Sequence, residues 1–132
     1  MKKLFRILVM LMVAVVAVGV TSCGKSKGEK AREEIARAVH NMDLPMKINN
    51  NTTLTDCEFK GNTLYMHNEV PAATLAAIDR EELRDSTLRK LRGGMLPRKL
   101  VKRLVEANAS IEFVYYNGDD SISINFPASK LH

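Results

Sequence analysis

The fold of this chain is decided by two alternating stretches, and the clearer one is residues 111–126, IEFVYYNGDDSISINF. Apolar and polar side chains alternate on both sides of an Asn-Gly pair, which is the strongest short signal for a β-hairpin. A loop at 117–118 or at 118–119 gives the same two faces. One face collects Ile111, Phe113, Tyr115, Ile122, Ile124 and Phe126. The stretch therefore predicts two antiparallel strands with one buried side.

A second hairpin is predicted over residues 55–68, TDCEFKGNTLYMHN, with Gly61 and Asn62 as a two-residue loop. That register pairs Lys60 with Thr63, Phe59 with Leu64, Cys57 with Met66 and Thr55 with Asn68. One face is then largely apolar, and the other carries Asp56, Glu58, Tyr65 and His67. Cys57 is expected on the core face, where a thiol packs as a small hydrophobic group.

Helical spacing of apolar residues occurs in three places around these hairpins, at 29–42, 79–92 and 97–107. Asp79 with Glu82 matches a helix start, and Gly93-Gly94 matches a helix end. Residues 71–78 are either the start of the middle helix or a loop. The predicted fold is α+β, with about four antiparallel strands in one sheet and helices packed on one face.

The N-terminus has the three zones of a secretory signal: basic residues within 2–6, a twelve-residue apolar run at 7–18, and a small-residue end. The apolar run is shorter than the roughly 20 residues that a membrane-spanning helix needs. Val20-Thr21-Ser22-Cys23 resembles the lipobox of bacterial lipoproteins. The resemblance implies that Cys23 receives a diacylglyceryl group and that the chain is cut before it, with the new amine a further site for a fatty acid such as palmitate.

Two other interpretations of this segment stay open, an ordinary cleaved signal with a chance Cys, or an uncleaved anchor. With lipidation, we expect a signal peptide at 1–22, a lipidated tether at 23–28 and a single domain at 29–132. Two or more acyl chains hold a protein stably on a membrane. The mature part carries 17 basic and 15 acidic residues, because three of the 20 Lys and Arg residues lie in the signal. The basic composition of the full chain is therefore no argument for nucleic-acid binding.

Cys57 has no partner in the mature chain once Cys23 is lipidated. An odd Cys in an oxidising compartment is either a buried free thiol or one half of an intermolecular bridge. The predicted register favours the buried thiol, but the sequence leaves both open.

The sequence gives little support for a catalytic site or a metal site. His40, His67 and His132 lie far apart in sequence and have no close metal-ligand partners. Asp119 and Asp120 fall in a tight turn, where Asp is favoured for its geometry. No Gly-x-Ser-x-Gly motif and no Gly-rich phosphate loop are present. We expect no enzyme activity, no catalytic residue, no metal and no cofactor.

Charge and aromatic side chains indicate two candidate surfaces. Residues 84–103 contain eight basic residues against one acid: Arg84, Arg89, Lys90, Arg92, Arg98, Lys99, Lys102 and Arg103. They form either a solvated helix face, paired in part with nearby acids, or a surface for anionic lipid or an acidic partner. The outer sheet face would gather Tyr65, His67, Val114 and Tyr116, unless helix 29–42 packs over them.

Beyond the lipobox, the chain resembles small α+β lipoproteins of undefined function from Bacteroides-like bacteria. The resemblance lies in Leu44-Pro45, Thr52-Thr53-Leu54-Thr55, Tyr65 and Tyr115-Tyr116-Asn117-Gly118, and it implies no activity. In such bacteria, acidic residues after the lipid Cys resemble a signal for surface display. Gly24-Lys25-Ser26-Lys27 lacks them, which favours the periplasmic face, and the absence of Asp after Cys23 favours the outer membrane.

The expected function is a non-enzymatic interaction module, tethered to the membrane, with an envelope protein as partner. Arg98, Lys99, Lys102, Arg103, Tyr65 and Tyr116 are its candidate surface residues. The alternative is a domain that binds a small molecule or a peptide in a pocket between sheet and helices.

Overall fold

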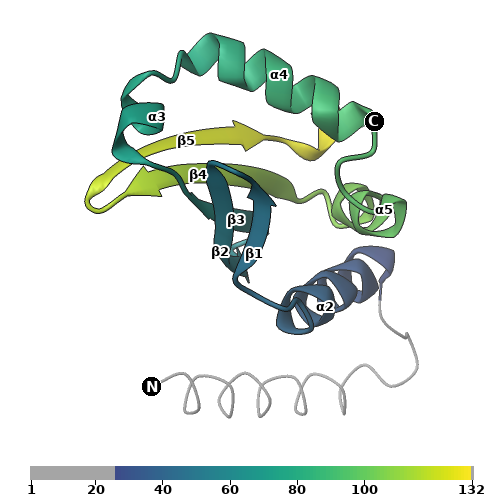
Figure 1. Ribbon diagram of the computed structural model, residues 1–132. Helices are drawn as coiled ribbons and strands as arrows, with labels where there is room; N and C mark the ends of the chain where they lie inside the picture. The colour runs from purple at the N-terminus through teal and green to yellow at the C-terminus, as the bar shows by residue number, and fades with distance from the viewer. Residues whose placement is uncertain (1–25, 132) are drawn as a thin grey trace.

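The computed structural model describes residues 26–131, so the predicted signal peptide, Cys23 and His132 lie outside the described part (Figure 1). The elements in chain order are α2 (Lys27–His40), β1 (Met46–Asn49), β2 (Thr52–Lys60), β3 (Thr63–Glu69), α3 (Ala72–Ala76), α4 (Arg80–Arg92), α5 (Arg98–Glu106), β4 (Ser110–Asn117), β5 (Asp120–Phe126) and a short 3₁₀ turn (Ala128–Lys130). One five-stranded sheet runs in the order β1-β2-β3-β4-β5.

The hairpin of β2 and β3 confirms the predicted register over most of its length. Gly61 and Asn62 both have positive φ, 56° and 64°, as a two-residue loop of this kind requires. Cys57 pairs with Met66, and both side chains are buried. The predicted pairing of Thr55 with Asn68 is wrong, because the register shifts between Leu54 and Asp56 and Leu54 takes the place opposite Asn68. Thr55 is the extra residue of this β-bulge.

The hairpin of β4 and β5 is also confirmed, and its loop is Gly118-Asp119, since Asn117 pairs with Asp120. Ile111, Phe113, Ile124 and Phe126 are buried, as the alternation predicts. Tyr115 lies at the end of the same face against α4. Burial raises the pKa of its phenol, and a hydrogen bond with Thr87 of α4 acts in the opposite direction. Thr87 and Tyr115 thus join α4 to the sheet.

The predicted strand number and the all-antiparallel sheet need correction. Strand β1 adds a fifth strand by pairing antiparallel with the start of β2, and its four residues are too few to reveal a strand pattern in the sequence. Strands β3 and β4 run parallel. The reason is that the three helices between the hairpins return the chain to the end of the sheet where β3 began, as a crossover connection does.

The helices begin and end close to the predicted positions. Helix α2 begins at Lys27, two residues before the predicted start, because Ser26 caps it by accepting a hydrogen bond from the Glu29 N–H at 3.2 Å. Asp79 caps α4 in the same way, accepting from the N–H groups of Glu81 and Glu82. The open stretch 71–78 contains the short helix α3 followed by a link to α4.

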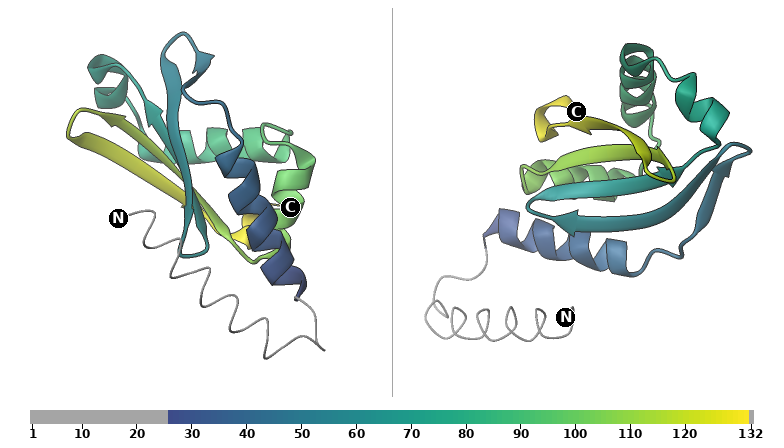
Figure 2. Two further views of the ribbon diagram at one scale, coloured as in Figure 1. Left: turned by 90° about the horizontal axis from the view of Figure 1, so that it is seen from below. Right: turned by 90° about the vertical axis from the view of Figure 1, so that its left-hand side faces the viewer.

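The core lies between one face of the sheet and helices α2, α4 and α5. Ile35 of α2, Leu91 of α4 and Leu104 of α5 belong to one buried cluster that also holds Cys57 and Ile111 of the sheet. Figure 2 (right) shows the strands in front and α5 behind them, so the opposite face of the sheet is turned away from α5. The prediction of helices on one face is confirmed.

Candidate functional site

The outer face of the sheet carries the predicted aromatic group. The register places His67 beside Val114 and Glu69 beside Tyr116, while Tyr65 precedes His67 by one repeat of the strand. All four of the predicted residues are half-buried. The buried side chains of α2 pack into the core on the other face, so this helix does not cover the group. The question that the sequence left open is therefore decided in favour of an uncovered face within residues 26–131.

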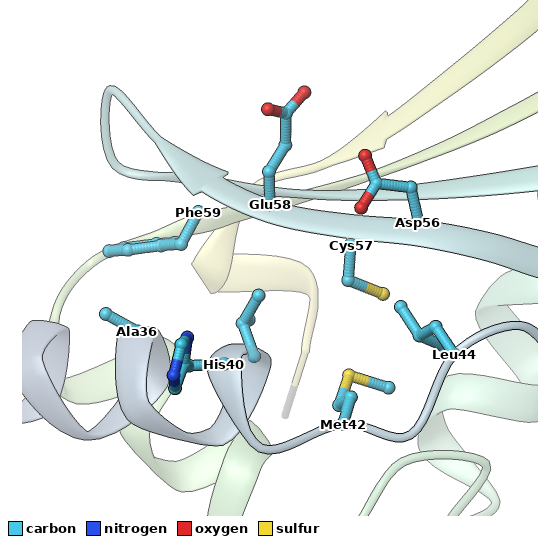
Figure 3. Close-up of a pocket in the computed structure, with 9 residues that line it drawn as sticks. Ala36, His40, Met42, Leu44, Asp56, Cys57, Glu58 and Phe59 are labelled. Carbon is cyan, nitrogen blue, oxygen red and sulfur yellow. The ribbon is translucent and has the colours of Figure 1, made fainter. Parts of the chain in front are cut away.

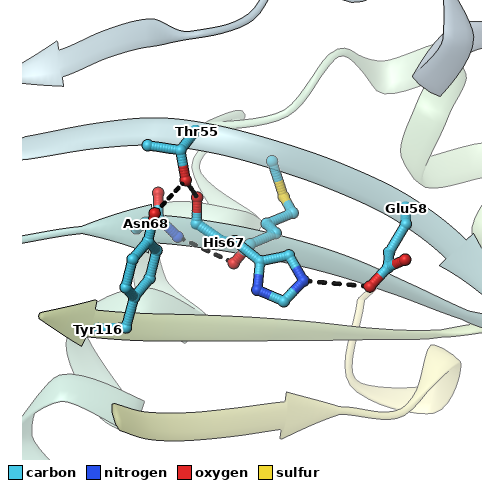
Figure 4. A network of polar contacts seen from close by, with 6 residues as sticks. Thr55, Glu58, His67, Asn68 and Tyr116 are labelled. Carbon is cyan, nitrogen blue, oxygen red and sulfur yellow. Dashed lines mark hydrogen bonds and ion pairs between the residues drawn. The ribbon is translucent and has the colours of Figure 1, made fainter. Parts of the chain in front are cut away.

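Hydrogen bonds hold this face in order (Figure 4). The Thr55 hydroxyl donates to the backbone oxygen of His67 at 3.2 Å and lies 2.7 Å from the Tyr116 hydroxyl. Because Thr has one hydroxyl hydrogen, the Tyr116 hydroxyl is the donor to Thr55. His67 Nε2 lies 3.3 Å from Glu58 Oε1, and its ring stacks with Tyr65 at a centroid distance of 6.4 Å. The aromatic rings are thus pre-positioned, which lowers the entropy cost of binding.

A groove of about 390 Å³ lies on the other side of the sheet, between α2, the link that follows it, and strand β2 (Figure 3). Apolar and polar residues line it: Ala36, Val39, His40, Met42, Leu44, Asp56, Cys57, Glu58 and Phe59. The side chains of Asp56 and Glu58 point away from it, on the other side of β2 (Figure 3). Its volume is near the lower end of the range for ligand pockets. The alternative function predicted from the sequence needed a pocket of this size and mixed lining.

Cys57 faces the inside of this groove but is a poor nucleophile. Burial, with a smaller contribution from Asp56, raises the pKa of its thiol to about 11. Since the thiolate is the reactive form, the side chain is chemically quiet near neutral pH. Its sulfur points toward Met42 and Leu44 in Figure 3, while His40 lies beside Ala36. His67 is on the opposite face of the sheet, as predicted.

The basic residues of α4 and α5 are mostly solvated. Seven of the eight are exposed and form no ion pair with the described residues. Arg103 differs, because it pairs with Glu34 of α2 and with Glu106 at 2.7 Å. Glu106 also lies 3.5 Å from Lys27, so the start of α2 rests against the end of α5. Arg98, Lys99 and Lys102 are the free cations of α5.

The remaining predictions concern Cys23, the Asp119-Asp120 pair, metal binding and membrane spans. Cys23 lies outside the described residues, and Asp119 and Asp120 are exposed in the β4–β5 turn. Within residues 26–131, no group of three or more His, Cys, Asp or Glu side chains is arranged to hold a metal ion. No helix of this part is both long and apolar enough to cross a membrane.

Two features of the site were not predicted from the sequence. The Thr55–Tyr116 contact depends on the β-bulge, which has no reliable signal in a single sequence. The groove exists because the link after α2 leaves the sheet edge, and only the break at Leu44-Pro45 hinted at such a departure.

No known protein family matches the chain, and no curated protein matches it either. Two solved structures share the fold. A candidate secreted protein from Pseudomonas aeruginosa is 18% identical with a TM-score of 0.63, over 83% of this chain and all of that one. The pilotin EpsS from the type 2 secretion system of Vibrio vulnificus is 11% identical with a TM-score of 0.61, over 80% of this chain and 96% of that one. At these identities the likeness concerns the fold alone.

Proposed function

We propose that the protein is a lipid-anchored, non-enzymatic interaction module of the cell envelope, with residues 1–22 as its signal peptide and Cys23 as its lipidated first residue. The lipobox-like Val20-Thr21-Ser22-Cys23 supports the anchor, and the absence of acidic residues in Gly24-Lys25-Ser26-Lys27 supports the periplasmic side of the outer membrane as its place. The fold shared with a pilotin of a type 2 secretion system supports a binding role beside an envelope protein.

The short link between the lipid and the domain supports a defined orientation. Cys23 is three residues from Ser26, the cap of α2, so the chain spans at most roughly 11 Å between them. The start of α2 rests against the end of α5 through Lys27 and Glu106. Helix α5 therefore stays close to the bilayer, where each free cation near anionic headgroups contributes about 1 kcal/mol.

The observation that carries the interaction role is the uncovered aromatic face of the sheet. Tyr65, His67, Val114 and Tyr116 lie on the side away from α5, and hence away from the anchored side. Tyrosines with fixed rings are enriched where protein partners bind, because they bury large area at low entropy cost. In this arrangement the helical side faces the membrane and the sheet presents itself to an envelope protein.

Photo-crosslinking in intact cells tests this arrangement. A photoreactive residue replaces Val114 on the outer face, and the matched control replaces Ser129, an exposed residue of the C-terminal turn. We expect Val114 to capture one envelope protein that Ser129 does not, and Tyr65→Ser to reduce the capture several-fold. Capture from neither position, or equal capture from both, would contradict the proposed face.

The groove favours a second candidate function, the binding of a small molecule or peptide between sheet and helices. Its volume of about 390 Å³ and its mixed lining are what such a site requires. A photoreactive residue at His40, inside the groove, separates the two functions. Capture from His40 without capture from Val114 would place the partner in the groove.

A further inference from the structure

Half of one edge of strand β2 has no neighbouring strand. Strand β1 pairs only with Thr52, Thr53 and Leu54, because the chain arrives from α2 and joins the sheet at Met46. Strand β2 continues past this point to Lys60. Beyond the bulge, no backbone group on this edge of β2 has a hydrogen-bonded partner among residues 26–131. An open strand edge of this kind is a template for an added strand.

The backbone of two residues is directed to this free edge. Lys60 and Thr63 close the β2–β3 hairpin around a two-residue loop, and such closing residues bond to each other. In an antiparallel ladder the direction of the N–H and C=O groups alternates from one residue to the next. Those of Cys57 and Phe59 therefore point away from β3, toward the open side.

The groove begins at the same place. The side chains of Cys57 and Phe59 line one side of it, and Ala36 and Met42 line the opposite side (Figure 3). A strand added to the edge would direct every second side chain into this space, because side chains alternate between the two faces. The volume of about 390 Å³ is open for those side chains, and Val39, Met42 and Phe59 in the lining offer them apolar contacts.

Charge selects the other side chains of the added strand. Asp56 and Glu58 alternate with the groove residues and lie on the outer face, where both are exposed. Asp56 makes no ion pair within the described part, and Glu58 contacts only His67 there. Side chains directly opposite them on a new strand are stabilised when they are basic and destabilised when they are acidic. Lys60 is the next residue on this face and would repel a basic side chain, so the preference for basic side chains holds only opposite Asp56 and Glu58.

The same charges disfavour a second copy of this chain at the edge. An antiparallel pair centred on Cys57 would set Asp56 of each copy against Glu58 of the other, twice over. The residues that join the lipid to α2 are also excluded in the mature protein. They span at most roughly 11 Å from Ser26, while Ala36 lies about 15 Å along the helix from that cap.

We propose that the free edge of β2 and the adjoining groove bind an extended peptide segment of another protein by strand addition. The segment has apolar residues alternating with Lys or Arg, the apolar ones in the groove and the basic ones beside Asp56 and Glu58. Asp56 and Glu58 stand beside His67 and Tyr65, so this site borders the outer aromatic face, whereas the groove and the free strand edge lie outside that face.

Peptide binding to the full-length protein in detergent micelles tests the proposal. The probe is the heptapeptide TTVKVKT with a fluorescent label, and TTVEVET is its acidic counterpart; the second Thr faces Lys60 when the two Val residues face Phe59 and Cys57. We expect saturable binding of the basic peptide, about tenfold tighter than that of the acidic one, since two cross-strand pairs change sign. Hydrogen exchange of the Cys57 and Phe59 amides should slow when the basic peptide binds. N-methylation of the Val opposite Cys57 should weaken binding, because the N–H of that residue would donate to the ladder and the methyl group removes the donor.

Two substitutions locate the site, each with a matched control. Ala36→Trp fills the groove from an exposed helix position and should abolish binding, whereas Ala38→Trp, exposed on the same helix outside the groove lining, should not. Asp56→Lys should weaken the basic peptide at least about threefold and strengthen the acidic one. Asp119→Lys, in the β4–β5 turn, should change neither affinity.

Three results would overturn the proposal. The first is equal affinity for the basic and acidic peptides, or no binding of either. The second is binding that Ala36→Trp leaves intact. The third is a concentration-dependent dimer that Ala36→Trp dissolves, which would show that a second copy occupies the groove. Capture of a partner from Val114 alone would leave the function proposed above standing in each case.

Discussion

Thr55 links the backbone of β2 to the aromatic face through a single hydroxyl group. It donates to the His67 backbone oxygen on β3 and accepts from the Tyr116 hydroxyl on β4. Both contacts depend on the β-bulge, because regular alternation continued from Cys57 would point Thr55 to the core face, as it does Cys57. One residue thus fixes the order of the proposed binding face.

Thr55→Val is expected to lower the free energy of unfolding by about 1 kcal/mol, since it removes two hydrogen bonds of a half-buried group and keeps the side-chain shape. Denaturant unfolding measures the change. Thr53→Val is the matched control, because Thr53 lies on the same strand and its side chain forms no hydrogen bond within residues 26–131. Equal effects of the two substitutions would mean that the Thr55 contacts are not specific.

Cys57 makes a second prediction at the residue scale. Its pKa is about 11 in the folded chain and close to 9 when unfolded, so the unfolded state loses the proton first as pH rises. The contribution to stability is fully present below pH 9 and is lost between pH 9 and 11. We expect a loss on the order of 1 kcal/mol, less than the full shift implies, because the groove is open to solvent.

The difference in unfolding free energy between wild type and Cys57→Ala measures this loss. It should shrink across pH 9 to 11 and stay level from pH 6 to 8. Slow alkylation of the native thiol by iodoacetamide at pH 7 is the independent check. Alkylation as fast as that of an unfolded control would contradict a buried, protonated thiol.

The elements differ in how far their sequence determines them. Both hairpins are predictable because each has a turn signal flanked by regular alternation, and Cys57 follows from that register. The two ends of α4 are also predictable, because the Asp79 side chain caps its first turn and Gly93-Gly94 follows its last residue. Strand β1 does not, because four exposed residues form no buried face.

The arrangement of the elements relative to one another could be predicted less well from the sequence. The parallel pairing of β3 with β4 depends on how three helices pack as one crossover, which no local pattern encodes. The groove and the free edge of β2 depend on where β1 begins, at Met46, and therefore on the path of the chain between α2 and β1 rather than on a sequence motif. The outer aromatic group was predictable from alternation, whereas its uncovered state required knowing which face α2 packs on.

Glu106 joins two elements and gives a prediction at their scale. The hydrogen bond from Arg103 lowers the pKa of Glu106, and Lys27 adds to the effect, although desolvation acts against it. The stabilisation is present above the ordinary pKa of glutamate and is lost as pH falls through the lowered value. Glu106→Gln should therefore lower the melting temperature by a few degrees at pH 7 and flatten its dependence on pH below 5.

Thermal unfolding from pH 7 to pH 3 measures this effect. Glu69→Gln is the control, because Glu69 is exposed and forms no ion pair within the described part of the chain. A further test is hydrogen exchange in α2, which should rise in Glu106→Gln if this residue holds α2 against α5. Unchanged exchange in α2 would mean that the apolar contacts of Ala31 and Ile35 are sufficient.

At the scale of the whole molecule, the outer aromatic face and the groove lie on opposite sides of the sheet, and the free edge of β2 lies between them. The groove is on the side that carries the helices, which is also the proposed anchored side. Helix α5 sits near the start of α2 and carries the free cations Arg98, Lys99 and Lys102. Arg103 is engaged with Glu34 and Glu106, so substituting it would disturb the packing of α2 as well as the surface charge. A test of membrane contact should therefore leave Arg103 in place.

The lipid and the cations make separable predictions for the mature protein on vesicles. Cys23→Ala should abolish incorporation of labelled palmitate and leave the protein either uncleaved or off the membrane fraction, because three cations alone give only weak attraction. In the lipidated protein, anionic vesicles should slow hydrogen exchange in α5 relative to neutral ones. Changing Arg98, Lys99 and Lys102 to Gln should remove that difference, while the same change at Arg84, Arg89 and Lys90 of α4 should preserve it. If the α4 variant loses the difference equally, the cations act through net charge, and α5 is not held against the bilayer. If Cys23→Ala still incorporates palmitate, the anchor assignment is wrong and the orientation derived from it falls with it.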